Sequence, residues 1–426
     1  FARMENFLRE EIGTGALPTN MNGWSNPLPF QAARQAYDYV DEHFYVDHPQ
    51  WIGERWRLPS RIPNRSPVAQ GAPGGRNRAF MRLMDKPFTV SEYNYAGPGR
   101  YRGVGGILTG CLAALQDWSV VWRFAYSHNR GNLFEPARAG YFDLATDALN
   151  QAAERASLCL FLRGDMAPAP HAVTVGATEE MLTAAGAPAR DVAPAWDALA
   201  LLTRVGTHVG DGPAPGDLVL RLGDAAAGGA VDMDPYDSGT GARLVAELRR
   251  QGWLGRDNLT DLDRKRHHSE TGELLVDGAR DVLVLDTPGT AGGYAPAGES
   301  LTAGPVSVRV RDVGATVWVS SLDDEPVGES RRMLLTHLTD LQNSGARFAE
   351  SARRTLLAWG GLPHVVRRGR AEVRLRRDGA LTVYGLATSG RRTGPVAVER
   401  DGDEWVIPLD TDAGGTARML YEVVAE

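Results

Sequence analysis

The order of apolar and polar residues divides the 426-residue chain into three stretches. In residues 1–140, short apolar runs alternate with segments whose apolar residues recur at helical spacing. Every expected strand here ends in polar residues at its carboxyl end, which is typical of parallel βα units whose functional loops gather on one face. The strands that we expect are residues 17–24, 39–49, 87–95 and 120–128.

The pattern of apolar residues after residue 140 predicts a bridging region followed by an all-β region. Residues 141–280 contain helical segments joined by connections rich in Ala, Pro and Gly, which predicts a mixed α/β bridging region. From residue 281 the period becomes two, so we expect an antiparallel β-sandwich over residues 281–426. The pairs Asp378-Gly379 and Asp401-Gly402 are typical of hairpin turns.

Composition restricts the class of partner more than it changes the fold. Apolar residues make up 43% of the chain and charged residues 23%, which is ordinary for a globular protein. The net charge of −7 argues against nucleic acid and anionic membranes as partners. No apolar run reaches the roughly 18 residues that span a bilayer, so we expect no membrane partner. Because His267 and His268 lack a third ligand at metal spacing, we expect them in a solvated loop, and we expect no metal or other cofactor.

Polar side chains gather at the carboxyl ends of the expected strands. Because neighbouring parallel strands end at one edge of a sheet, we expect these side chains to meet in one cleft. A glutamate in such a cleft can attack an anomeric carbon, and a Tyr or His from the next strand can hold it ionised. The alternative is a strand-end glutamate that forms a salt bridge or caps a helix. The residues concerned are Asn20, Asn22, His43, Tyr45, Glu92, Asn94, Tyr126 and His128.

Four motifs in this order resemble those of the clan A glycoside hydrolases, which are retaining enzymes with a (β/α)8 barrel. "KPFTVSEYNY" resembles the seventh barrel strand of that clan, and "DEHFYVDHP" resembles the sixth. "VVWRFAYSH" is similar to the eighth strand, and "PTNMNGW" is similar to the fifth. The resemblance covers about 130 residues and implies that residues 1–140 are strands five to eight of a barrel, which is its C-terminal half.

The resemblance also implies a role for each strand-end residue. Glu92 takes the place of the catalytic nucleophile, and His43 and Tyr45 take the places of the two side chains beside it. Tyr126 or its neighbour would supply the aromatic floor of the sugar site. The other residues that we expect to contact substrate are Asn20, Asn22, Trp24, Asn94 and His128.

The expected general acid/base is absent from these motifs. In the family it is a Glu that follows an Asn, and this sequence contains no Asn-Glu pair. Glu42 should point away from His43 on an extended strand, and Asp47 lies just past the strand tip, so neither is a good substitute. We therefore expect the acid/base Glu upstream of this chain. A half barrel exposes strand edges, which a missing half-barrel segment or a second copy of the chain would have to cover.

The function predicted from the sequence is that of a retaining glycoside hydrolase. Its substrate would be a β-linked oligo- or polysaccharide, with Glu92 as the nucleophile. The alternative is a non-catalytic carbohydrate-binding or scaffold protein derived from such an enzyme. A polymer-degrading activity favours a secreted or periplasmic location over the cytoplasm.

Overall fold

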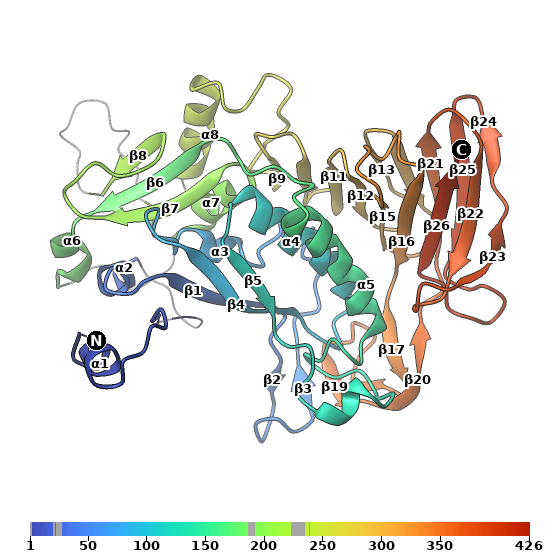
Figure 1. Ribbon diagram of the computed structural model, residues 1–426, viewed down its shortest axis with the longest axis horizontal. Helices are drawn as coiled ribbons and strands as arrows, with labels where there is room; N and C mark the ends of the chain where they lie inside the picture. The colour runs from blue at the N-terminus through green and yellow to red at the C-terminus, as the bar shows by residue number, and fades with distance from the viewer. Residues whose placement is uncertain (1, 20–21, 23–27, 186–191, 223–234, 238) are drawn as a thin grey trace.

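The computed structural model describes residues 2–19, 22, 28–185, 192–222, 235–237 and 239–426. The chain is mixed α/β in its first part and antiparallel β in its last part, as the change of period predicts. These two parts lie toward opposite ends of the long axis of the molecule (Figure 1).

The first segment is helical, and its apolar side chains are exposed. Helix α1 (Ala2–Asn6) continues into the π-helical turn η1 (Phe7–Glu11), which agrees with the helical spacing of the sequence. No residue of either element is buried, and Met4 is 61% exposed. The apolar side of this helix therefore has no core to pack against within the described part of the chain.

Three of the four strands expected in residues 1–140 form one parallel sheet. They are β1 (Val40–Val46), β4 (Phe88–Tyr95) and β5 (Val120–Arg123), in the order β1-β4-β5. Residues 17–19 belong to no strand, and Asn20 and Trp24 lie outside the described residues. The sheet is open, and no closed barrel forms among the residues that the structure describes. The helices of this region are α2 (Phe30–Arg34), α3 (Arg76–Ala79), η2 (Arg102–Val104), α4 (Gly105–Leu115), η3 (Arg130–Leu133), α5 (Ala148–Ser157) and η4 (Leu158–Leu162).

Close helix packing explains two glycines within α4. A Cβ atom on Gly106 would lie 1.7 Å from the carbonyl oxygen of Ala153 in α5, and one on Gly110 would lie 2.8 Å from the Cα of Ser157. Only glycine allows the two backbones to approach so closely. These glycines of α4 therefore form a packing surface for α5.

A second parallel sheet forms the bridging region. It contains β7 (Arg204–Val209), β6 (Ala172–Ala177) and β8 (Leu218–Arg221), in that order. A parallel bridge between Leu83 and Thr207 joins it to the first region. The helices around it are α6 (Glu179–Thr183), α7 (Pro194–Asp197), η5 (Ala198–Leu201) and α8 (Thr240–Arg250).

The antiparallel region is built on a nine-stranded sheet that begins before residue 281. Its edge strand β9 (Arg266–His268) and the neighbouring strand β10 (Leu274–Asp277) come from the end of the expected bridging region. His267 and His268 both lie in strand β9, and His267 is buried, so the expectation that they lie in a solvated loop is wrong. The other strands are β11 (Val282–Asp286), β12 (Thr290–Ala295), β15 (Ala315–Ser321), β16 (Arg332–Leu338), β26 (Leu420–Ala425), β22 (Leu381–Leu386) and β23 (Arg392–Val396).

A five-stranded antiparallel sheet shares a buried core with the nine-stranded one. Asp401 pairs with Glu404 across a hairpin, so the hairpin at Asp401-Gly402 is confirmed. The strands on either side of Asp378-Gly379 belong to different sheets, so the hairpin expected there is wrong, and the turn passes between the sheets. The five strands are β13 (Ser300–Ala303), β14 (Val306–Val310), β21 (Arg370–Arg376), β25 (Glu404–Asp410) and β24 (Glu399–Asp401).

Residues 341–366 leave the antiparallel region and pair with the loop segment between β1 and β4; we call residues 341–366 the extension. The first and last strands of the extension, β17 (Leu341–Ser344) and β20 (Gly361–Val366), pair with each other. Between them in the chain lie β18 (Arg347–Phe348) and β19 (Thr355–Ala358), which also pair with each other. Strand β19 pairs with β3 (Ser60–Arg61), and β3 pairs with β2 (Gln50–Trp51). Figure 1 shows β19 beside β3.

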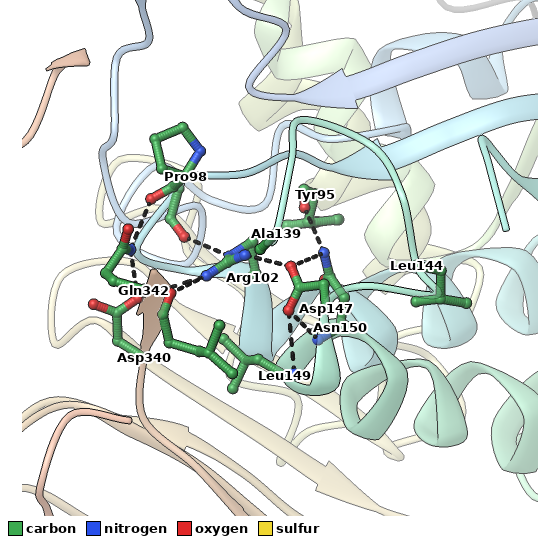
Figure 2. A network of polar contacts seen from close by, with 12 residues as sticks. Tyr95, Pro98, Arg102, Ala139, Leu144, Asp147, Leu149, Asn150, Asp340 and Gln342 are labelled. Carbon is green, nitrogen blue, oxygen red and sulfur yellow. Dashed lines mark hydrogen bonds and ion pairs between the residues drawn. The ribbon is translucent and has the colours of Figure 1, made fainter. Parts of the chain in front are cut away.

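A buried ion pair anchors the start of the extension. The guanidinium of Arg102 bonds to the Asp147 carboxylate and donates to the carbonyl oxygens of Leu341 and, at 2.9 Å, of Gly99. Asp147 also caps α5 by accepting from the backbone N–H groups of Leu149 and Asn150, each at 3.1 Å (Figure 2). The pair therefore joins the turn η2, helix α5 and the extension.

Candidate active site

The site lies on one face of β1 and β4. In a strand, alternate side chains share a face, which places Asp41, His43 and Tyr45 of β1 together. His43 stands opposite Glu92 in the register of the two strands, just after an irregularity between Glu42 and His43. Three of the side chains expected at the strand ends are therefore brought together.

Glu92 is held by a tyrosine and lies beside a histidine. The Tyr45 hydroxyl donates a hydrogen bond to Glu92 Oε2 over 2.5 Å, and His43 Nδ1 lies 3.4 Å from the same oxygen. Burial and the hydrogen bond to Glu92 raise the pKa of Tyr45, so its hydroxyl remains a donor at neutral pH. Because the Glu92 side chain is 32% exposed, it is oriented by protein contacts and still open to a ligand.

A buried aspartate that is not among the residues predicted from the sequence supports this arrangement. Asp41 Oδ1 accepts from the Ser91 N–H at 2.9 Å, and Oδ2 accepts from the Ser91 hydroxyl at 2.5 Å and from Asn22 Nδ2 at 2.8 Å. Burial raises the pKa of Asp41, but hydrogen bonds from His43, Asn22, Ser91 and Thr89 outweigh burial and bring it to about 2. His43 Nε2 lies 2.9 Å from the Ser91 hydroxyl. The alternation of side chains along β1 places Asp41 on the same face as His43 and Tyr45. This alternation is the sequence signal from which a role for Asp41 could have been predicted.

Two of the expected substrate contacts occupy different environments. Asn22 is exposed and lies at the edge of the site, with its amide nitrogen 3.2 Å from His43 Nε2. Asn94 is fully buried: it donates to the carbonyl oxygens of Phe124 and Phe142, at 2.5 and 2.9 Å, and accepts from Arg123 at 2.9 Å. Its side chain therefore holds the wall of the site together, and because it is buried and both of its polar atoms have protein partners, it does not face a ligand. Asn20 and Trp24 cannot be placed, since they lie outside the described residues.

The residues expected at the end of β5 are more exposed than a sugar floor requires. Tyr126 is 63% exposed. His128 is exposed as well, and its Nδ1 lies 2.5 Å from Asp143 Oδ1. The ring that packs beside Tyr45 is instead Phe124, at 6.2 Å between centroids in an edge-to-face arrangement.

Neither of the substitute carboxylates reaches Glu92. Glu42 forms an ion pair of 2.5 Å with Arg34 and is completely buried, on the opposite face from His43 as expected. Asp47 accepts a hydrogen bond of 2.9 Å from the backbone of Asn64, and burial raises its pKa. Within the described ranges, no cluster of three or more His, Cys, Asp or Glu is arranged to hold a metal ion.

A pocket of about 570 Å³ opens beside Tyr45; we call it the aromatic pocket. The Tyr45 ring contacts its wall at Phe142, with centroids 5.3 Å apart. Trp359 enters it from the extension, which no local pattern in the sequence indicated. The lining residues are Trp56, Phe124, His128, Arg138, Gly140, Tyr141, Phe142, Asp143 and Trp359.

Comparisons with known proteins add little to this geometry. No family model matches the chain, and no curated protein matches it. Among the solved structures that the comparison returned is one described as the crystal structure of Thermotoga maritima alpha-fucosidase. Its sequence is 11% identical to this chain, the match covers 93% of this chain and 77% of the alpha-fucosidase chain, and the TM-score is 0.16. A likeness at that level supports no argument about fold or function. Among the described residues, no helix has both the length and the apolar character needed to span a membrane.

Proposed function

We propose that this protein is a retaining glycoside hydrolase that acts on a β-linked glycan, with Glu92 as the nucleophile. The observation that carries the proposal is the 2.5 Å hydrogen bond from Tyr45 to a partly exposed Glu92. A hydrogen bond to the charged form of a carboxylate favours ionisation and fixes its direction. A fixed and accessible carboxylate of this kind suits attack on an anomeric carbon.

The chemistry proceeds in two steps. The Glu92 carboxylate attacks the anomeric carbon and forms a glycosyl-enzyme, while a general acid protonates the departing glycosidic oxygen. Water then attacks the same carbon with the second residue acting as base, and Glu92 is released. The second carboxyl group must lie about 5–5.5 Å from Glu92. We propose that it is a Glu outside the described residues, as the sequence motifs imply.

In this proposal, β1, β4 and β5 are the sixth, seventh and eighth strands of a (β/α)8 barrel, and the antiparallel region is an accessory β-sandwich. Exposed apolar side chains beside β5 support it. Trp122 of β5 is 54% exposed, and Leu162 at the end of η4 is 72% exposed. An uncovered strand edge favours pairing with another strand. A further segment or a second copy of the chain would cover this edge.

Covalent trapping tests the nucleophile directly. The chain is incubated with dinitrophenyl 2-deoxy-2-fluoro-β-glycosides, whose leaving group needs no general acid, and its peptides are analysed by mass spectrometry. We expect the label on Glu92, none in the Glu92→Gln variant, and normal labelling in a Glu54→Gln control. Glu54 is an exposed residue paired with Arg57. Labelling of another carboxylate, or labelling that survives Glu92→Gln, would contradict the proposal.

The aromatic pocket favours a second candidate function, which is carbohydrate binding without hydrolysis. Exposed tryptophan faces suit the apolar faces of sugar rings, and they need no nucleophile. Binding of a glycan by the wild-type chain, with neither labelling of Glu92 nor turnover of a dinitrophenyl glycoside, would favour this candidate.

A further inference from the structure

We propose that the aromatic pocket binds the sugar ring next to the one attacked by Glu92, so that the substrate extends over at least two rings. The location of the second ring rests on the proposed function. The volume of about 570 Å³ falls within the roughly 300–1,000 Å³ of pockets that bind small molecules. A pocket of this size holds a complete sugar ring.

The tryptophans of the pocket are held in place by their neighbours. Trp56 is 56% exposed, and its inner side packs on Trp51 with centroids 4.3 Å apart. Trp359 and Tyr141 pack edge to face, with ring centroids 4.7 Å apart, and the Arg138 guanidinium lies 5.2 Å from the Trp359 ring centre. Rings that are already ordered lose little conformational entropy when a ligand stacks on them. The pocket therefore presents preformed apolar surfaces.

Charged groups at the rim supply the hydrogen bonds that sugar hydroxyls require. The Asp143 carboxylate is fixed by His128 Nδ1 at 2.5 Å and by Asn132 Nδ2 at 3.2 Å. Arg138 is exposed and brings guanidinium donors. A sugar ring has apolar C–H faces and a polar edge of hydroxyl groups, so it matches aromatic walls with a few polar groups around them.

The wall of the pocket packs against Tyr45, the residue that holds the candidate nucleophile. Tyr45 donates its hydroxyl hydrogen to Glu92, while its ring packs against the pocket residues Phe124 and Phe142. A glycan whose reacting ring lies at Glu92 can thus place its next ring beyond Tyr45, in the pocket.

The extension completes the pocket from a distant part of the chain. Asn343 accepts from the Ala139 N–H at 2.8 Å and donates to the carbonyl oxygens of Ala139 and Trp359, at 2.9 and 3.0 Å. These bonds fix the backbone of Trp359 against the segment that carries Arg138. The antiparallel region therefore contributes directly to ligand binding.

Isothermal titration of the Glu92→Gln chain tests the inference, because this variant is expected to bind a glycan without cleaving it. The probes are cellotriose, β-1,4-galactotriose and β-1,4-xylotriose. We expect at least one to bind, and we expect Trp359→Ala or Trp56→Ala to weaken its affinity roughly tenfold or more, as for an aromatic anchor. Trp359→Phe should restore most of the affinity. The matched control is Trp405→Ala, since Trp405 carries a similar arginine contact, Arg400 at 5.6 Å, in the distant five-stranded sheet.

The outcomes separate this inference from the proposed function. Unchanged affinity in both Trp56→Ala and Trp359→Ala, or no binding of any trisaccharide, overturns the inference even where Glu92 is labelled. Affinity that depends on Trp359 in a chain whose Glu92 is never labelled supports the sugar site and overturns the nucleophile. Because Trp56 is exposed, Trp56→Ala leaves the test valid if Trp359→Ala does not fold.

Discussion

Arg102→Met removes the cation from a buried ion pair, and we expect it to be among the most destabilising single changes in this protein. Both side chains of the Arg102–Asp147 pair are only 2% exposed. Without Arg102, the Asp147 carboxylate remains in the interior with no opposite charge, and the carbonyl oxygens of Leu341 and Gly99 each lose a donor. Breaking a buried ion pair from one side costs about 3–5 kcal/mol.

The contacts of this ion pair also predict how much related variants lower the free energy of unfolding. Arg102→Met leaves the Asp147 cap on α5 in place, whereas Asp147→Leu removes it as well, so Asp147→Leu should cost about 1 kcal/mol more. The double variant Arg102→Met/Asp147→Leu should cost less than the sum of the two, because it leaves no unpaired charge.

Urea unfolding followed by tryptophan fluorescence measures these differences. The control is Arg311→Met. Arg311 forms an ion pair of 2.6 Å with Glu372, and the Arg311 side chain is 40% exposed. Exposed pairs contribute about 0–1 kcal/mol. If Arg102→Met lowers the free energy of unfolding no more than Arg311→Met does, the reasoning from burial is refuted.

Three further predictions concern acid stability, the nucleophile and helix packing. Burial lowers the pKa of His337 to about 4, so the unfolded chain binds the extra proton first as the pH falls. Stability should therefore decrease between about pH 6.5 and 4, by up to about 3 kcal/mol from His337. His337→Leu should reduce the fall of the melting temperature with pH over that range, and the buried His267, whose pKa burial also lowers, should account for part of the fall that remains. Tyr45→Phe removes the donor to Glu92 and should lower kcat/KM on a dinitrophenyl glycoside by roughly tenfold or more, because a hydrogen bond to a charged group contributes about 1.5–3 kcal/mol; unchanged kcat/KM would contradict this. Gly106→Ala places a Cβ atom 1.7 Å from a backbone oxygen of the facing helix and should cost at least about 1–3 kcal/mol in thermal unfolding, whereas Gly255→Ala, with no atom within 4 Å of its Cβ, should not.

Much of the parallel sheet and of the Glu92 environment was predictable from local patterns. An apolar run that ends in polar residues predicts a parallel strand whose tip carries function, and β1, β4 and β5 follow that rule. Alternation along β1 also determines that His43 and Tyr45 share a face and that Glu42 points away. These features depend on residues a few positions apart, which is why the sequence by itself determined them.

Other features were decided only when distant segments packed together. The sequence around His267 predicts a solvated loop, but His267 is buried in the edge strand β9. The turn at Asp378-Gly379 has the residues of a hairpin, yet its two flanking strands find better partners in separate sheets. Local turn chemistry sets the direction of the chain, whereas the burial of apolar faces selects which strands pair.

The aromatic pocket shows this division most clearly. Tyr45 and Phe124 come from the parallel sheet and its end, whereas Trp359 arrives on the extension, more than 200 residues later in the chain. Its position depends on the pairing of β19 with β3 and on the buried Arg102–Asp147 pair that anchors Leu341. The sequence by itself determined a strand tip with Glu92, His43 and Tyr45. Only the tertiary structure placed a tryptophan-lined pocket beside it, because such contacts arise from long-range packing that no local periodicity encodes.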